Sequence, residues 1–266
     1  MHILVLGAAG MVGRKLVERL VRDGRLGEAA ITRMTLQDIV APAKPDTSLK
    51  VETIAGDFAV AGFAEKLVAD RPDVIFHLAA IVSGEAELDF DKGYRINLDG
   101  TRMLFDAVRL IGDGYKPRLV FTSSIAVFGA PFPDAIGDEF VNAPLLSYGT
   151  QKAIGELLLA DYSRRGFFDG VGIRLPTIGV RPGASNKAAS GFFSNILREP
   201  LAGKEAVLPV SVVAACRRKP TAERGVACQW RTSSDTGSTA SLPASGSRRM
   251  LEKKPEAALL DAPGRT

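Results

Sequence analysis

The chain has 266 residues, of which 46% are hydrophobic and 24% charged, enough for one large α/β domain or one and a half. It contains no apolar run of about 18 residues and opens directly into a strand-like segment, so the sequence predicts neither a membrane span nor a signal peptide. A cytoplasmic location is the default expectation. Its two cysteines, Cys216 and Cys228, form neither a disulfide framework nor a metal cluster, so no metal site is predicted.

The formal net charge of +4 comes from the last part of the chain. Residues 1–210 carry 24 Lys and Arg against 25 Asp and Glu, whereas residues 211–266 carry 10 against 5. The charge of the remaining body is therefore close to balanced, and a nucleic-acid-binding function is rejected for it.

The N-terminal segment has the order strand, glycine turn, helix. An apolar run at 2–6 is followed by Gly7, Gly10 and Gly13, and then by helical spacing of apolar residues up to residue 22. Such a turn lets the backbone approach a pyrophosphate, to which the helix N-terminus presents free N–H groups. The GxxGxxG spacing alone is a weak signal, but its position favours a dinucleotide-binding turn.

Strand-like and helix-like segments then alternate along the body. The expected strands are 2–6, 34–39, 50–54, 74–78, 118–122 and 171–175, and the expected helices are 11–22, 62–70, 90–111 and 148–165. This alternation predicts an α/β fold with a doubly wound parallel sheet of the Rossmann type. Ligands bind at the carboxyl ends of such strands, where Asp38, Asp57, His77 and Ser124 fall.

Tyr148 and Lys152 begin one of the expected helices. Residues four apart share a helix face, so the ammonium is expected beside the phenol. A phenol titrates near pH ~10. A neighbouring cation can lower that pKa enough for the phenol to act as a base. The alternative is a half-buried tyrosine and a solvated lysine that share a helix by chance.

Together these segments resemble the extended short-chain dehydrogenase/reductase family, an NAD-dependent group that includes nucleotide-sugar epimerases and dehydratases. The matching motifs follow the family's order within residues 1–210: GAAGMVG (7–13), GDF (56–58), HLAA (77–80), NLDGT (97–101), TSSIAVFG (122–129), YGTQK (148–152) and IRLPTI (173–178). Residues 76–102 and 172–183 are most similar to the branch that oxidises C2 of a four-carbon sugar acid, D-erythronate.

The resemblance implies four catalytic residues. Tyr148 would be the general base for alcohol oxidation, and Lys152 would lower its pKa and bind the nicotinamide ribose. Ser124 would hold the substrate oxygen; it is preferred to Ser123 because the family places this serine five residues before a glycine, here Gly129. Asn97 would help to order Lys152 and a water molecule.

The resemblance also implies a cofactor site for NAD. Its glycines would cradle the pyrophosphate. Asp38 would bind the adenosine ribose and repel a 2′-phosphate, which favours NAD over NADP. Asp57 and Phe58 would flank the adenine. The full expected set is Gly7, Gly10, Met11, Gly13, Asp38, Asp57, Phe58, Leu78, Ala79, Ala80, Tyr148, Lys152, Pro176 and Ile178.

The substrate is expected to contact Ser83, Ser124, Tyr148 and Arg181. Arg174 and Arg181 are candidates for a substrate carboxylate, since arginine binds carboxylates through two hydrogen bonds. Structural alternatives remain: the arginines could be solvated, the serines and Asp38 could cap turns, and His77 could serve packing rather than catalysis.

Three segments are expected in the domain organisation. Residues 1–180 would form the NAD-binding domain with the catalytic residues, and 181–210 would begin a substrate domain. Residues 211–266 lose the regular pattern and are rich in Ser, Thr, Arg and Gly between 221 and 247, a composition that cannot bury a core. They are either a natural flexible tail or an out-of-frame segment that leaves the substrate domain incomplete.

The sequence therefore predicts an NAD-dependent oxidoreductase that converts the 2-hydroxyl of a small sugar acid to a ketone. A nucleotide-sugar epimerase or dehydratase is the alternative on the same scaffold. A non-catalytic NAD-binding protein or damaged product is the alternative from another class. The expected partner is a small hydroxy acid, with no nucleic acid and no membrane, and a homodimer is left open.

Overall fold

The computed structural model describes residues 1–133, 135–137, 139–179, 191–207 and 239–240. The chain divides into two compact units, residues 1–194 and 195–266. No helix in the described part is long and apolar enough to cross a membrane.

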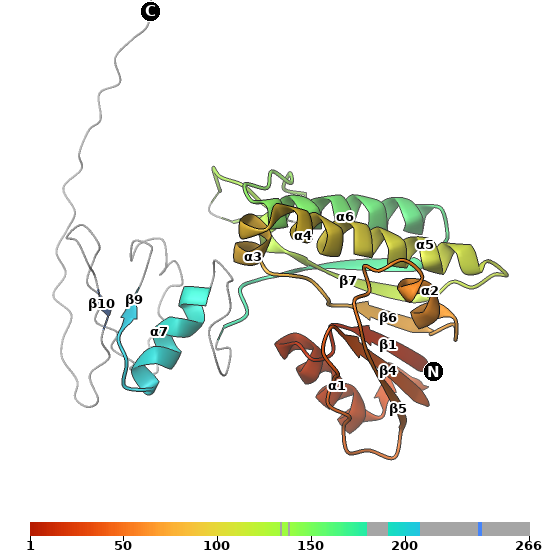
Figure 1. Ribbon diagram of the computed structural model, residues 1–266. Coiled ribbons are helices and arrows are strands. Elements are labelled where there is room, and N and C mark those ends of the chain that lie inside the picture. Colours follow the sequence, from red (N-terminus) through yellow and green to blue (C-terminus); the bar gives the residue numbers. More distant parts are fainter. Residues whose placement is uncertain (134, 138, 180–190, 208–238, 241–266) are drawn as a thin grey trace, which may run out of the picture. The chain divides into compact units, whose positions relative to one another are not determined.

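The first unit is built on a six-stranded parallel sheet with the order β5-β4-β1-β6-β7-β8 (Figure 1). The strands are β1 (His2–Leu6), β4 (Arg33–Asp38), β5 (Lys50–Ala55), β6 (Val74–His77), β7 (Arg118–Ser124) and β8 (Asp169–Leu175). The predicted doubly wound sheet is confirmed, and each predicted strand end lies within two residues of the observed one.

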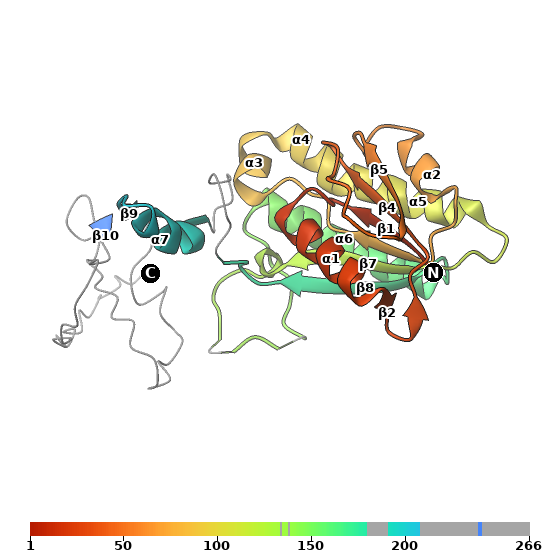
Figure 2. The same cartoon turned by 90° about the horizontal axis from the view of Figure 1, so that it is seen from below.

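Alternate residues of β1 face opposite sides of the sheet. Ile3 and Val5 pack with α1 (Met11–Asp23) on one side, whereas Leu4 and Leu6 lie in the core under the helices of the other side. Figures 1 and 2 show α1 on the opposite side of the sheet from those helices. Those helices are α2 (Phe63–Val68), α5 (Thr101–Ile111) and α6 (Ser147–Arg164). The two sides of the sheet thus carry separate apolar clusters, and burial on both faces is why the central strands read as unbroken apolar runs.

The single helix expected at 90–111 is interrupted. It consists of α4 (Phe90–Tyr94), a π-helical turn η1 (Arg95–Gly100) and α5. The hydroxyl of Thr101 donates a 2.7 Å hydrogen bond to the carbonyl of Asn97 inside this turn. A π-turn inserts an extra residue into a helix and is frequent at functional sites. Here it contains Asn97, one of the predicted site residues.

Several short elements were not predicted from the sequence. They are the exposed hairpin β2 (Arg25–Leu26) and β3 (Ala29–Ala30), helix α3 (Ser83–Leu88), and the 3-10 turn η2 (Ile125–Val127). Each is too short to show helical or strand periodicity. Of these, α3 and η2 carry residues of the site described below.

The chain also forms helix α7 (Phe192–Leu201) and the strands β9 (Ala206–Val207) and β10 (Thr239–Ala240). Strands β9 and β10 pair in antiparallel fashion. Residues 180–190, 208–238 and 241–266 lie outside the described residues, as do 134 and 138. The predicted tail at 211–266 therefore lies almost wholly outside them, and the predicted domain boundaries stay predictions.

Candidate active site

A cavity of about 900 Å³ runs along the carboxyl ends of the parallel strands in the first unit. Its walls come from the glycine loop after β1, from the segments that follow the other strands, and from the start of α6. This is the edge at which ligands bind in open α/β sheets, and the volume suits a small molecule or cofactor.

The glycine loop is shaped by close backbone contacts. Gly7 has a φ of 84°, and a Cβ atom there would lie 2.7 Å from the backbone nitrogen of Ala79. A Cβ atom on Gly13 would lie 2.1 Å from the carbonyl oxygen of Gly7. Gly10 precedes α1 with no side-chain cap, so the first N–H groups of the helix have no side-chain acceptor at that residue. The loop can thus pass between β6 and α1 and present its backbone to the cavity.

Two carboxylates, those of Asp38 and Asp57, border the cavity. Asp38 accepts hydrogen bonds from the backbone nitrogens of Ala9 at 2.9 Å and Ile39 at 2.7 Å. Asp57 forms a 2.7 Å ion pair with Arg95. Asp38 therefore fastens the glycine loop to the end of β4, as the turn-capping alternative expects, while it also borders the cavity.

Ser124 and Tyr148 meet where β7 ends and α6 begins. The Ser124 hydroxyl accepts a 3.1 Å hydrogen bond from the backbone nitrogen of Ala126 in η2. A Cβ atom on Gly149 would lie 2.1 Å from the Ala126 carbonyl oxygen, so glycine allows α6 to approach η2 closely. Burial raises the pKa of Tyr148, and its hydrogen bond with Ser124 partly offsets that rise.

Lys152 lies one helical turn beyond Tyr148 and is 2% exposed. Burial lowers its pKa to about 8. Its Nζ atom lies 4.7 Å from the centroid of the Phe121 ring and 5.8 Å from that of the Tyr148 ring. The pKa of Tyr148 is thus raised in this structure, opposite to the shift predicted from the sequence, because burial of the phenol is the largest influence on it.

His77 is fully buried and bonded to the Thr101 hydroxyl at 2.9 Å. Burial and the nearby charge of Lys152 lower the pKa of His77 to about 3, so the ring is neutral near pH 7. It is not among the described residues that line the cavity, which favours the packing role over a catalytic one.

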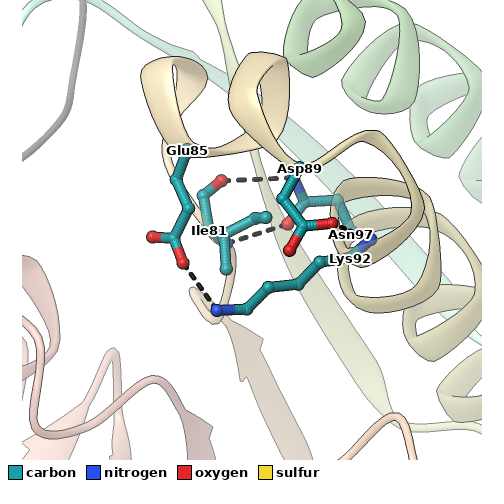
Figure 3. Close-up of polar contacts among 5 residues, drawn as sticks. All are labelled: Ile81, Glu85, Asp89, Lys92 and Asn97. Carbon is teal, nitrogen blue, oxygen red and sulfur yellow. Dashed lines mark hydrogen bonds and ion pairs between the residues drawn. The ribbon is translucent and has the colours of Figure 1, made fainter.

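The Asn97 side chain is 1% exposed and makes three hydrogen bonds, of which Figure 3 draws the two to Ile81. Its Oδ1 accepts from the backbone nitrogen of Ile81 at 2.9 Å, and its Nδ2 donates to the Ile81 carbonyl at 3.1 Å and to Gln151 Oε1 at 2.8 Å. The role that the resemblance implies for Asn97, ordering Lys152 and a water molecule, stays a prediction. The observed bonds hold the segment after β6 and the residue beside Lys152.

Arg174 is directed at Glu156 on α6. Its Nε and Nη2 atoms lie 3.0 and 2.8 Å from the two Glu156 oxygens. Glu156 also accepts hydrogen bonds from Ser123 and Asn142. The proposal that Arg174 receives a substrate carboxylate is therefore not supported, because its guanidinium already binds one carboxylate through two bonds. Arg181, the other candidate, lies outside the described residues.

The other predicted site residues border the cavity, whereas Asn97 and Lys152 are not among its described lining residues. The lining members of the predicted set are Gly7, Gly10, Met11, Gly13, Asp38, Asp57, Phe58, Leu78, Ala79, Ala80, Ser83, Ser124, Tyr148, Pro176 and Ile178. One cavity thus collects the predicted cofactor residues other than Lys152, together with three of the four predicted substrate residues.

Sequence reasoning missed Gln37, Glu85 and Lys92, which also line the cavity. Gln37 Nε2 donates to the Gly56 carbonyl at 2.6 Å, while its Oε1 is buried without a hydrogen-bond partner. Glu85 and Lys92 form a 2.7 Å ion pair. Seven residues apart, they would be two turns apart on a single helix, and they meet because the chain breaks between α3 and α4 at Asp89. No group of three or more potential metal ligands occurs in the described part of the chain.

The comparisons with known proteins agree with this geometry. A model of the NAD dependent epimerase/dehydratase family matches residues 3–218. D-erythronate dehydrogenase of Cupriavidus necator is 47% identical over 215 residues, which cover 79% of this chain and 65% of the relative. The protein of that name from Haemophilus influenzae is 42% identical over 211 residues, with the same two shares. The chain thus spans 65% of the length of these curated relatives.

A solved structure is also similar to this chain. The crystal structure of the nucleoside-diphosphate-sugar epimerase from Agrobacterium tumefaciens is 71% identical, with a TM-score of 0.75, and the match covers 79% of this chain and 62% of that one. The family predicted from the motifs is confirmed by these matches.

NAD is the cofactor of this family, and the described residues fit a dinucleotide. The glycine loop leaves no room for side chains at Gly7 and Gly13, and the first turn of α1 faces the cavity. Gln37 Oε1 is a buried acceptor without a partner in the same wall. A pyrophosphate requires backbone N–H donors such as those at a helix N-terminus. An adenosine requires hydrogen-bond acceptors in the same cavity.

Proposed function

Since the chain belongs to the NAD dependent epimerase/dehydratase family, we propose that it is an NAD-dependent dehydrogenase of a small sugar acid such as D-erythronate. It would oxidise the 2-hydroxyl to the 2-keto acid. The observation that carries this proposal is that Ser124 and Tyr148 border the same cavity, with buried Lys152 one turn further along α6. The names of the two curated relatives support the substrate class.

In the proposed reaction Tyr148 takes the proton of the substrate hydroxyl, and Ser124 hydrogen-bonds the same oxygen. NAD⁺ held by the glycine loop at Gly7, Gly10 and Gly13 would supply the hydride acceptor for C2, so that alcohol and NAD⁺ would give ketone, NADH and one proton. Burial opposes ionisation of Tyr148. The Lys152 ammonium on the same helix favours the phenolate electrostatically, since a nearby opposite charge stabilises an ionised group.

The remaining roles are proposed from position. Asp38 would bind the adenosine ribose, and Asp57 with Phe58 would flank the adenine, since all three border the cavity. Asn97 would act through Ile81 and Gln151 rather than on the reacting atoms. Arg181 stays a proposed carboxylate ligand. The boundaries at residues 180 and 210 stay part of this proposal.

A nucleotide-sugar epimerase is the second candidate, because the 71% identical solved structure bears that description. Two assays separate the candidates. The first follows NADH absorbance with NAD⁺ and D-erythronate. The second follows interconversion of UDP-glucose and UDP-galactose with catalytic NAD⁺. Reduction of NAD⁺ by the acid without sugar-nucleotide turnover supports the dehydrogenase, and the reverse pattern overturns it in favour of the epimerase. Loss of both activities with intact NAD binding would identify a non-catalytic NAD-binding protein.

We also propose a homodimer. Leu157 on α6 and Leu110 on α5 are 70% and 66% exposed, and a second copy could cover this apolar area. Analytical ultracentrifugation at micromolar concentration tests this part separately. A monomer at every concentration would remove the dimer from the proposal without affecting the chemistry.

A further inference from the structure

The ion pair of Glu85 and Lys92 forms part of the cavity wall. Glu85 comes from α3 and Lys92 from α4, and Figure 3 shows their side chains directed toward each other below Ile81. The Lys92 Nζ atom lies 2.7 Å from Glu85 Oε1, and the two side chains are 43% and 32% exposed. The backbone nitrogen of Lys92 donates to Asp89, which caps α4 and fixes where the lysine emerges.

The charges around the cavity are unevenly distributed. Among the described lining residues the carboxylates are Asp38, Asp57 and Glu85, and Lys92 is the one cation. Asp57 is paired with Arg95, which itself is not among the described lining residues. The ligands of the proposed function are anionic, since NAD carries a pyrophosphate and a sugar acid carries a carboxylate. The described wall therefore provides one side-chain cation for anionic ligands.

We propose that Lys92 is an anion-binding residue of this cavity. When ligand binds, its ammonium leaves Glu85 and donates to an anionic oxygen of the cofactor pyrophosphate or of the acid substrate. Glu85 holds the ammonium at the wall until then. Exposed ion pairs contribute little to stability, so the exchange of partner costs little. A hydrogen bond from an ammonium to phosphate or carboxylate in a partly desolvated cavity is stronger than a neutral one.

The position of Lys92 suits a hydrogen bond to an oxygen of either ligand, the cofactor pyrophosphate or the substrate carboxylate. Ile96, one turn further along the same helical stretch, lines the cavity and packs against the cluster that contains Phe58. Glu85 lies two residues after Ser83, a predicted substrate contact. Lys92 therefore borders the same cavity as the proposed adenine contact Phe58 and the proposed substrate contact Ser83. The inference rests on the proposed function only where the acid is the ligand.

Calorimetric titration of the full chain tests the inference without turnover. Wild type, Lys92→Met and Glu85→Gln are titrated with NAD⁺, ADP-ribose and adenosine. D-erythronate is then titrated into each protein saturated with NADH. Lys15→Met is the matched control, because Lys15 forms a 3.0 Å pair with Glu18 on α1 and does not line the cavity.

If the pyrophosphate is the ligand, Lys92→Met weakens NAD⁺ and ADP-ribose by about tenfold and leaves adenosine unchanged. If the carboxylate is the ligand, NAD⁺ binding stays within about twofold and erythronate binding weakens by about tenfold. Glu85→Gln, which removes the competing carboxylate, should bind the same ligand at least as tightly as wild type. Affinities of Lys92→Met within about twofold of wild type for every probe would overturn the inference. Failure of erythronate to bind wild type would count against the proposed substrate, while the NAD⁺ titrations still decide the pyrophosphate arm.

Discussion

The amide of Asn97 donates a 2.8 Å hydrogen bond to the side-chain carbonyl of Gln151, the residue directly before Lys152. Both side chains are buried, at 1% and 0% exposure. Through its other two bonds Asn97 also holds the backbone of Ile81, which lines the cavity. The π-turn, the segment after β6 and helix α6 are thus joined by one side chain.

Replacing Gln151 with Met should loosen this junction. The variant keeps the volume but removes the acceptor for Asn97, and a buried amide that loses a partner costs about 1–3 kcal/mol. We expect lower stability in urea and a higher KM for the acid, because Ile81 and its neighbours would be held less firmly. Thr150→Val is the control, since that hydroxyl bonds only Leu146 within its own helix. Equal kinetics and stability of Gln151→Met and Thr150→Val would contradict this role.

Buried Lys152 should destabilise the protein in a pH-dependent way. Its pKa is about 8 in the fold against an ordinary lysine value of 10.5. Between these values the unfolded chain binds a proton that the folded chain has released, so stability rises with pH over this window. Below pH 8 the full cost, on the order of 3 kcal/mol, is present. Lys152→Met should be more stable than wild type at pH 7, and the difference should shrink toward pH 10. Urea unfolding of both proteins at four pH values measures this difference in stability. If the stabilities of wild type and Lys152→Met changed in parallel with pH, burial would not be lowering the pKa of the lysine.

The sheet could be predicted from sequence because central strands such as His2–Leu6 and Val74–His77 are apolar runs and helix-like segments lie between the strands. The glycine loop could also be predicted, because Gly7 and Gly13 are needed at positions where a side chain would clash with the backbone. The break between α3 and α4 could not, because six-residue helices such as Ser83–Leu88 show too few turns to establish a period. The π-turn was likewise hidden inside a continuous helical pattern.

Asp38 should control the choice of cofactor. A carboxylate close to a 2′-phosphate would cost about 1–4 kcal/mol, depending on how far solvent screens the pair. Asp38→Asn removes the charge but keeps one acceptor for the backbone N–H groups of Ala9 and Ile39. We expect its preference for NAD⁺ over NADP⁺ to fall by at least about tenfold, measured as the ratio of the two Kd values. Tighter binding of NADP⁺ than of NAD⁺ by the wild-type protein would refute the assignment.

The proposal for residues 211–266 has a direct test in the coding DNA and in the protein. Val171 and Ile173 on β8 are 39% and 44% exposed, which leaves apolar area uncovered on that strand. If the segment is out of frame or unfolded, protease should remove it first and leave a fragment that ends near residue 210. Mass spectrometry of a limited digest reads the end point, and translation of the other frames past codon 210 checks the reading frame. A resistant fragment that retains residue 266 would contradict the proposal.

The roles of individual site residues depended on contacts that no motif reveals. Tyr148, Lys152 and Ser124 could be found by their spacing, but the raised pKa of Tyr148 follows from burial of the phenol. Arg174 was an attractive carboxylate ligand by residue type, yet Glu156, eighteen residues earlier, binds it. Lys92 belongs to no recognisable motif. It reaches Glu85 in the cavity wall only because the short helices α3 and α4 lie against each other.

The central claim is that Tyr148 exchanges the proton of a substrate hydroxyl, and Tyr148→Phe tests it most directly. The substitution removes one hydroxyl and keeps the ring beside Lys152. A positioned base contributes typically about 10²–10⁴-fold to the rate. The measurement is kcat for NAD⁺ reduction by D-erythronate, with the Kd of NAD⁺ measured on the same samples. The account predicts a loss of at least about 100-fold in kcat with NAD⁺ affinity within about threefold of wild type. A kcat within a few-fold of wild type at unchanged NAD⁺ affinity would contradict it.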